Sequence, residues 1–201
     1  RNLATQASLE TIAADMQANE PKKMDTDTVS SYISALAKLF VVEESKAWNP
    51  NLRSKTAIRT SNTRYYTDPS IGTASLSIGP KDLENDLNTF GYFFETLAIR
   101  DLRTYAEALM GEVAHYRDAD KLECDAVVHL RDGRYGLIEI KLGGEALIKE
   151  GVKSLTALKN KLDTTKMNKP SFLMVLTGVG SIAYRRPEDG IYVVPIGCLK
   201  P

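Results

Sequence analysis

Apolar residues recur at two different periods in the second half of the chain. They follow a helical period over about residues 86–110 and again over about 146–162. Short runs rich in Val, Ile, Leu and Tyr, which favour strands, lie between and after these helices. These runs cover residues 112–117, 122–130, 135–142, 171–177, 182–185 and 191–196. The order α, three β, α, then β predicts an α/β sandwich with a mixed sheet.

The first part of the chain has a different order of elements. Helical spacing covers residues 3–16, and Asp25 is of a residue type that starts helices, followed by a second helical pattern. Strands are expected at residues 40–44 and 57–66. Two helices followed by a hairpin predict a winged-helix unit. Because a Gly/Pro/Ser-rich stretch follows at residues 71–80, we expect a winged-helix-like domain over residues 1–75 and the α/β domain over residues 81–201.

The segment around Arg131-Asp132-Gly133 predicts a β-hairpin whose register can be stated. A three-residue loop with Gly133 in the left-handed conformation pairs residues whose numbers sum to 264. Asp125 then lies opposite Glu139, and Glu123 lies opposite Lys141. Since side chains alternate along a strand, the hairpin has one apolar face and one face that gathers these three carboxylates and the ammonium. The apolar face holds Cys124, Ala126, Val128, Ile138 and Ile140.

Two opposed carboxylates repel each other unless a cation lies between them. Lys141 could supply that charge, and so could a divalent metal held by Asp125 and Glu139. Hard oxygen ligands favour Mg²⁺ or Mn²⁺, which orients water and stabilises charge on a phosphate. The alternative is a surface ion-pair ladder, in which Glu123 pairs with Lys141 and Asp125 with a neighbouring arginine.

A further carboxylate lies on the apolar face of the helix at residues 86–110. Glu95 shares this face with Gly91, Ala98 and Leu102 through helical spacing. Packed against the hairpin, it would join Asp125 and Glu139 as a metal-side or orienting group. The alternative is that Glu95 pairs with an arginine, and the candidates are Arg100, Arg103 and Arg117.

Composition and charge narrow the class of protein. The chain has 201 residues, 43% of them apolar, and a formal net charge of zero, which excludes a uniformly basic nucleic-acid coat. A local excess of lysine is nevertheless present around the helix at residues 146–162, and it is our predicted nucleic-acid-facing surface, with a solvated helix face as the alternative. Its lysines are Lys149, Lys153, Lys159, Lys161, Lys166 and Lys169.

The same composition indicates where the protein resides. Neither a signal pattern nor a run of about 20 apolar residues occurs, so we expect a cytoplasmic protein with no membrane partner. The two cysteines show no metal-ligand spacing. Because the sequence starts with Arg1 within helix-like sequence, we expect a fragment of a longer protein.

Several short motifs together resemble a known family. Phe94-Glu95, Tyr116-Arg117-Asp118, Glu123-Cys124-Asp125 and Glu139-Ile140-Lys141 resemble the C-terminal half of prokaryotic AAA+ ATPases that carry domain of unknown function 4143. That half is similar to the PD-(D/E)XK restriction-endonuclease fold, an αβββαβ sandwich. Residues 28–32 and 65–68 similarly resemble the winged-helix region of the family.

The resemblance implies roles for individual residues. It implies that Asp125 and Glu139 ligate Mg²⁺, that Lys141 assists the attacking water, and that Glu95 supports the metal. It also implies an ATPase domain in the same polypeptide as a partner. ATP would bind only there, because no G-x-x-x-x-G-K-[ST] sequence occurs in this chain and no ATPase activity is expected from it.

Two hypotheses on function follow. In the first, the chain is the C-terminal part of an AAA+ ATPase whose nuclease-like domain binds DNA or RNA and hydrolyses phosphodiesters with Mg²⁺. In the second, the same domain is a non-catalytic module that binds nucleic acid or protein, or that relays the motion of the ATPase.

Overall fold

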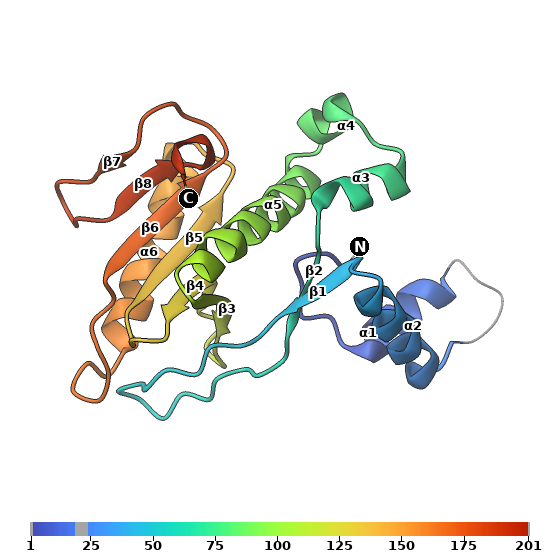
Figure 1. Ribbon diagram of the computed structural model, residues 1–201, viewed down its shortest axis with the longest axis horizontal. Helices are drawn as coiled ribbons and strands as arrows, with labels where there is room; N and C mark the ends of the chain where they lie inside the picture. The colour runs from blue at the N-terminus through green and yellow to red at the C-terminus, as the bar shows by residue number, and fades with distance from the viewer. Residues whose placement is uncertain (1, 19–23, 201) are drawn as a thin grey trace. The chain divides into compact units, whose positions relative to one another are not determined.

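The computed structural model describes residues 2–18 and 24–200, so that Arg1, Lys22 and Lys23 lie outside the described part (Figure 1). The chain forms two compact units that are interleaved in sequence. The first comprises residues 1–45 and 62–96, and the second comprises residues 46–61 and 97–201. The sequence had predicted two consecutive domains, with all of residues 46–61 in the first.

The first unit begins with two capped helices. Helix α1 covers Leu9–Gln17 and α2 covers Thr26–Lys38. The side chain of Asp25 accepts a hydrogen bond from the backbone nitrogen of Thr28 at 2.7 Å, which confirms the predicted helix start. Helix α1 starts later than the pattern indicated, because the hydroxyl of Ser8 accepts from Thr11 N and ends the preceding extended segment.

A short hairpin follows the two helices. Strands β1 (Val42–Ser45) and β2 (Thr63–Tyr66) pair antiparallel, with Val42 opposite Tyr66. Strand β2 is much shorter than the predicted strand at residues 57–66, since residues 57–61 belong to the second unit.

The Gly/Pro/Ser-rich stretch, at which the sequence indicated a division of the chain, is largely helical. It forms most of α3 (Pro69–Leu76) and the start of α4 (Pro80–Asn85). Pro69 stands in the first turn of α3, where its missing N–H costs nothing, and Asp68 caps the helix through Ser70 N at 2.8 Å. Ser77 ends α3 in the left-handed conformation. Helix α5 (Leu87–Ala108) then runs from the first unit into the second.

The second unit contains a mixed sheet of six strands in the order β3-β4-β5-β6-β8-β7. Strands β3, β4 and β5 are antiparallel neighbours, whereas β5, β6 and β8 are parallel. The strands are β3 (Gly111–Arg117), β4 (Glu123–Leu130), β5 (Tyr135–Lys141), β6 (Phe172–Thr177), β7 (Tyr184–Arg185) and β8 (Tyr192–Pro195). Helix α6 (Glu145–Lys161) connects β5 to β6, and a 3-10 turn, η1 (Ile196–Cys198), follows β8. The predicted mixed α/β architecture is therefore confirmed.

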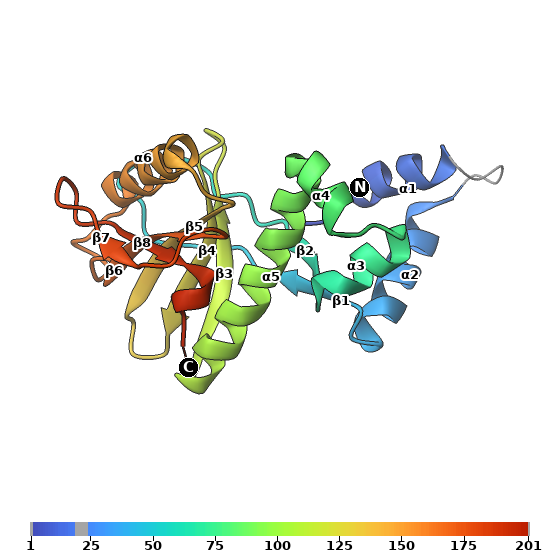
Figure 2. The same ribbon diagram turned by 90° about the horizontal axis from the view of Figure 1, so that it is seen from above.

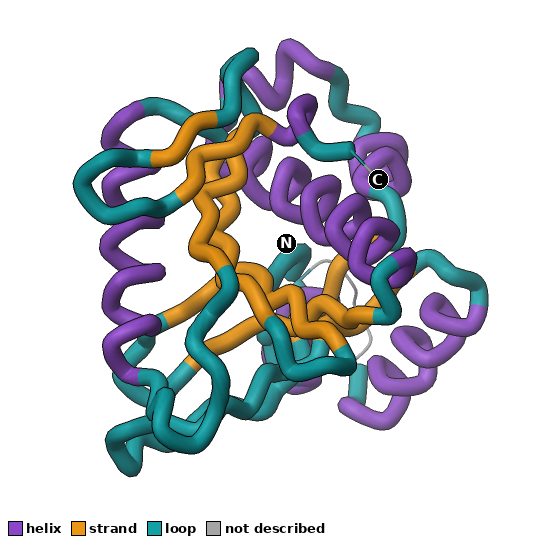
Figure 3. Tube along the Cα trace, turned by 60° about the vertical axis from the view of Figure 1, so that its left-hand side comes forward, coloured by secondary structure: helices purple, strands orange, loops and turns teal. Residues whose placement is uncertain are grey.

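Helices cover both faces of this sheet. Figures 2 and 3 show α6 on one side and the later part of α5 on the other. The face toward α6 forms a core cluster that includes Val127 and Leu137 of the hairpin with Leu155 and Leu158 of the helix. Within residues 2–18 and 24–200, no helix combines the length and apolarity that a membrane crossing needs.

Residues 46–61, which we call the strap, lie along the edge strand β3. Trp48 N donates to His115 O at 2.7 Å, His115 N donates to Lys46 O at 3.0 Å, and Arg59 N donates to Arg117 O at 2.8 Å. The ring of Trp48 packs against that of Tyr135 in a tilted arrangement, with 5.1 Å between the ring centroids. Because a sheet edge has unpaired backbone groups, the strap both satisfies β3 and adds side chains to the core.

Candidate functional site

The hairpin of β4 and β5 has the register that the sequence predicted. Val127 lies opposite Leu137, and His129 lies opposite Tyr135. Gly133 has a φ of 83°, which a residue with a side chain rarely adopts, and its nitrogen donates to Leu130 O at 3.0 Å. A local turn therefore determines which side chains lie opposite one another at the far end of the hairpin.

The regular pairing of β4 with β5 ends where the predicted site begins. The last pair is Ala126 with Ile138, and beyond it the carboxylate of Asp125 accepts a hydrogen bond from Ile140 N at 2.7 Å. The Asp125 side chain thus takes the place of a backbone acceptor from β4 for the Ile140 N–H of β5. This contact orients the Asp125 carboxylate, since a charged acceptor forms a strong hydrogen bond with a backbone amide.

Lys141 brings the two carboxylates of the hairpin together. Its Nζ lies 2.9 Å from Glu139 Oε2 and 3.7 Å from Asp125 Oδ2. We call Asp125, Glu139 and Lys141 the carboxylate–lysine cluster. The side chain of Glu139 is 4% exposed, and those of Asp125 and Lys141 are 18% and 19% exposed.

This burial contradicts the surface-ladder alternative for these three residues. Glu123, which that alternative paired with Lys141, forms an ion pair with Arg117 at 3.0 Å, and its side chain is 49% exposed. Of the four charged residues on this face of the hairpin, Glu123 is the one in an exposed ion pair, whose contribution to stability is small.

Helix α6 explains why the charged face of the hairpin is buried. The alternation separated an apolar face from a charged face, yet Val127, Tyr135 and Leu137 on the charged face pack under α6. Gly151 permits the close approach, because a Cβ atom at this position would lie 3.2 Å from Glu139 Cβ and 3.2 Å from Val175 Cγ2. The cluster thus lies beside the first turns of a helix, among apolar side chains.

Burial and charge act in opposite directions on Lys141. Burial alone would lower the pKa of its ammonium, but Asp125, Glu139 and, more weakly, Glu150 of α6 together raise that pKa well above its ordinary value. Lys141 is therefore an ammonium at neutral pH. Burial, with the nearby Glu139 and Asp125, also raises the pKa of the Cys124 thiol, so that this cysteine is a packing residue and not a nucleophile.

Glu95 belongs to the first compact unit. Its Oε1 accepts a hydrogen bond from the hydroxyl of Tyr65 at 2.7 Å, and this contact was not among the alternatives that the sequence indicated. Tyr65 is buried, with 2% of its surface exposed. The structure therefore brings together Asp125, Glu139 and Lys141, whereas a metal-supporting role for Glu95 stays a prediction.

The donor set of the cluster is compatible with a hard divalent cation. Asp125 and Glu139 offer carboxylate oxygens from adjacent strands, and Asp125 is partly accessible to solvent. Mg²⁺ is commonly bound by one or two carboxylates while it keeps several waters. In the described part of the chain, no group of three or more His, Cys, Asp or Glu side chains is placed to hold a metal. A metal here would depend on two carboxylates, water and substrate.

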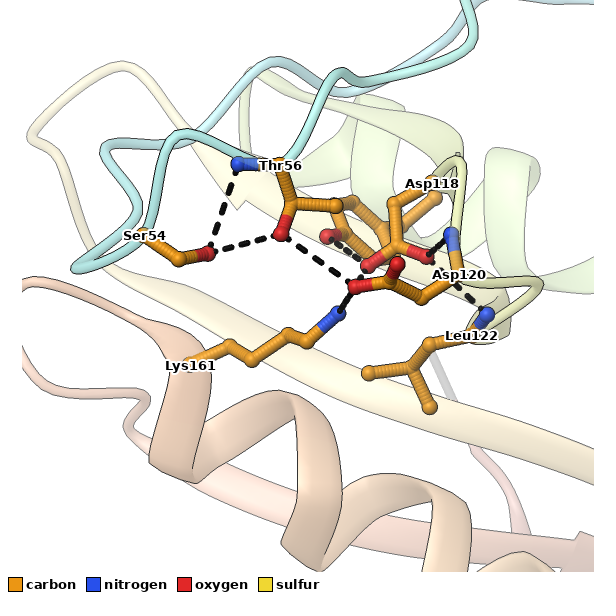
Figure 4. Close-up of polar contacts among 7 residues, drawn as sticks. Ser54, Thr56, Asp118, Asp120, Leu122 and Lys161 are labelled. Carbon is orange, nitrogen blue, oxygen red and sulfur yellow. Dashed lines mark hydrogen bonds and ion pairs between the residues drawn. The ribbon is translucent and has the colours of Figure 1, made fainter.

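A second charged cluster, which the sequence had not indicated as a unit, lies at the turn after β3 (Figure 4). Asp118 is completely buried, and its Oδ2 accepts from Lys161 Nζ at 2.6 Å and from the Tyr116 hydroxyl at 2.9 Å. Its Oδ1 accepts from the backbone nitrogens of Asp120 and Leu122 at 2.9 and 3.1 Å. Both oxygens of this carboxylate are therefore satisfied, which is typical of a structural role.

The same cluster attaches the strap. Lys161 Nζ also donates to Asp120 Oδ2 at 2.8 Å, and the hydroxyl of Thr56 donates to that oxygen at 3.2 Å. Three lysines of the predicted basic surface consequently have acidic partners. Lys161 pairs with Asp118 and Asp120, Lys149 with Glu145 at 2.6 Å, and Lys166 with Asp163 at 3.1 Å. The predicted excess of positive charge is thus smaller on the folded protein.

The fold and the cluster define an α/β domain with a pair of carboxylates and a lysine on one hairpin. The family model for a domain of unknown function (DUF4143) matches residues 90–199, and the chain belongs to this family, the C-terminal domain family of AAA-ATPase-associated proteins. A second model, for a domain of unknown function (DUF8612), matches residues 1–82. No curated protein and no solved structure matches the chain.

Proposed function

We propose that the second unit is a Mg²⁺- or Mn²⁺-dependent phosphodiesterase of the PD-(D/E)XK type that acts on DNA or RNA. The observation that carries this proposal is the position of Lys141 Nζ between two carboxylates, 2.9 Å from Glu139 and 3.7 Å from Asp125. The E-x-K spacing places Glu139 and Lys141 on the same face of β5, because strand side chains alternate. An acidic pair with an adjacent ammonium can serve both a metal and an anionic substrate.

In this proposal Asp125 and Glu139 hold the metal. When bound, the ion would lower the pKa of a water molecule that it coordinates and would stabilise the charge that develops on the phosphate. Asp125 is kept in position by Ile140 N, and Glu139 is held by packing against α6. These supports keep the two carboxylates from turning away from each other despite their like charges.

The protonation state of Lys141 decides its role. Because its pKa is raised well above the ordinary value, it donates hydrogen bonds and does not accept a proton in the metal-free protein. We infer that the ammonium orients the attacking water or a non-bridging phosphate oxygen through a hydrogen bond. Exposed lysines such as Lys153, Lys159 and Lys169 would contact the phosphate backbone.

A specific observation favours a second candidate function. Lys141 forms ion pairs with both carboxylates, so the cluster is partly compensated without any metal. The unit would then be a non-catalytic module that binds nucleic acid or protein, or that transmits the motion of an ATPase domain of the same polypeptide. In that case the cluster acts as a buried polar network that defines the packing of α6 on the hairpin.

Asp125→Asn tests the proposal, because it keeps the shape of the side chain and removes its charge. Mn²⁺ binding is measured by calorimetry, and cleavage is measured on labelled single- and double-stranded DNA and RNA with Mg²⁺. We expect the wild-type protein to bind Mn²⁺ and to cleave, and the variant to lose cleavage by about a hundredfold or more. The matched control is Asp132→Asn in the hairpin turn, whose carboxylate pairs with Arg134 and is half exposed.

Cleavage that is unaffected by Asp125→Asn contradicts the proposed site. Cleavage that depends on Asp125 and not on Asp132 supports the nuclease. Binding of Mn²⁺ without cleavage supports the non-catalytic module. Absence of Mn²⁺ binding to the wild-type protein contradicts the metal-dependent proposal.

A further inference from the structure

One acidic residue near the carboxylate–lysine cluster lies outside the sequence motif. Glu150 is exposed on α6, next to Gly151. Gly151 lies close to Glu139, since a Cβ atom added at Gly151 would lie 3.2 Å from Glu139 Cβ. Helix α6 therefore crosses β5 directly over Glu139, and Glu150 lies one residue from that crossing.

The direction of the chain places Glu150 on the Lys141 side of this crossing. Strand β5 ends at Lys141, and α6 starts four residues later at Glu145, so the first turns of α6 lie above the end of β5. In a helix the Cα–Cβ bond tilts toward the N-terminus, which here is the direction of Lys141. The negative charge of Glu150 acts on Lys141 accordingly, since it is one of three carboxylates that raise the pKa of the ammonium.

The ammonium of Lys141 occupies the place beside the two carboxylates at which a divalent metal ion would bind. This ammonium lies 2.9 Å from Glu139 Oε2, and two cations cannot share these carboxylate oxygens at such a distance without strong repulsion. We therefore expect Lys141 to move when a divalent ion binds these same oxygens. It is the last residue of β5, its side chain is long, and its surroundings are partly open to solvent, so the ammonium can swing while the backbone stays in place.

We propose that Glu150 is a positioning residue that receives the ammonium of Lys141 when a divalent cation occupies Asp125 and Glu139. The inference rests on the proposed metal-dependent function. Lys141 would then alternate between an inner position, paired with Glu139 and Asp125, and an outer position, paired with Glu150. In the outer position it stays beside the cluster, where it can bind an anionic substrate group.

Metal binding to a set of four proteins tests this role. The four proteins are the wild type, Glu150→Gln, Lys141→Met and the double variant. The probe is Mn²⁺ alone, and its binding is measured by calorimetry and by electron paramagnetic resonance. We expect Glu150→Gln to weaken Mn²⁺ binding by about threefold or more, because the displaced ammonium loses its acceptor. Lys141→Met should tighten binding, since it removes the competing cation. In the Lys141→Met background, Glu150→Gln should have no effect.

Glu145→Gln is the matched control on the same helix. Glu145 is highly exposed and pairs with Lys149 at 2.6 Å, so that its loss should leave Mn²⁺ binding unchanged. An equal effect of Glu150→Gln in the wild-type and Lys141→Met backgrounds overturns the inference. Glu150 would then act on Mn²⁺ itself, either as a direct ligand or through long-range electrostatic attraction. No effect of Glu150→Gln on a protein that binds Mn²⁺ overturns this inference alone. Absence of Mn²⁺ binding to the wild-type protein overturns the metal-dependent function together with this inference.

Discussion

Lys161 at the end of α6 and Asp118 after β3 form an ion pair of 2.6 Å in which the carboxylate is completely buried. The lysine is only 25% exposed, and it extends the pair to Asp120 and, through that residue, to Thr56 of the strap. A helix, a sheet edge and the strap therefore meet at Lys161 and the two carboxylates that it joins, Asp118 and Asp120. Because a buried charge without its partners is costly, this relationship leads to predictions about stability.

Asp118→Asn should destabilise the second unit strongly. The substitution keeps the size of the side chain but leaves the Lys161 ammonium without its buried partner and removes a charged acceptor from Tyr116. We expect a loss of about 2 to 3 kcal/mol in the free energy of unfolding, measured by urea denaturation. The control is Asp132→Asn, and a comparable effect of both substitutions would show that the buried pair is not special.

The same carboxylate makes stability depend on pH. Burial alone would raise the pKa of Asp118, but hydrogen bonds from Lys161, Tyr116 and Leu122 N outweigh it and lower that pKa. Since the folded pKa lies below the unfolded value of about 3.9, the contribution of Asp118 is present above that pH and is lost as the pH falls through the folded pKa. Urea midpoints between pH 7 and pH 2.5 should fall less steeply below pH 4 in Asp118→Asn than in the wild type. Parallel acid profiles would contradict this.

Trp48→Ala should release the strap from the sheet. The ring of Trp48 packs against those of Tyr135 and Tyr116, with ring centroids 5.1 and 6.4 Å away. The backbone nitrogen of Trp48 donates to His115 O. We expect about 3 kcal/mol of destabilisation from the lost packing. Hydrogen exchange should also accelerate at the amide of His115, which donates to Lys46 O of the strap.

Two further variants test this interpretation of Trp48. Trp48→Phe keeps an aromatic ring and should recover part of the stability, and Lys55→Ala, at an exposed strap position, should change little. Unchanged exchange at His115 in Trp48→Ala would show that the strap is held without this side chain.

Gly133→Ala should destabilise the hairpin without changing its chemistry. The φ of 83° at this position disfavours any residue with a Cβ, and we expect a cost of about 1 kcal/mol, measured by thermal unfolding. Gly197→Ala is the control, because no atom lies within 4 Å of the added Cβ and its φ is not in the left-handed region. Mn²⁺ binding should be unaffected, unless the register of the hairpin changes.

Local features of the sequence were sufficient for the hairpin and the main elements. Gly133 and the alternation of side chains determine a register that pairs Val127 with Leu137, and the same rule places Asp125 and Glu139 on one face. The helix start at Asp25 was equally local, since it needs only a side-chain oxygen three residues before a free N–H. Such features involve neighbours in sequence, and the pattern shows them directly.

The burial of the charged face depended on tertiary structure, because alternation does not say which element covers a face. Helix α6 covers it, and Gly151 allows the close approach to Glu139. The assignment of residues 46–61 to the second unit also required distant partners, namely the edge of β3 and the pair Lys161 and Asp118.

By itself, therefore, the sequence determined the register of the hairpin and the face on which Asp125, Glu139 and Lys141 lie, since both follow from neighbouring residues and a period of two. The tertiary structure alone decided that this face is buried under α6, that Glu95 bonds to Tyr65, and that Lys161 closes a structural cluster. These contacts join residues far apart in the chain, and they depend on how helices and strands pack.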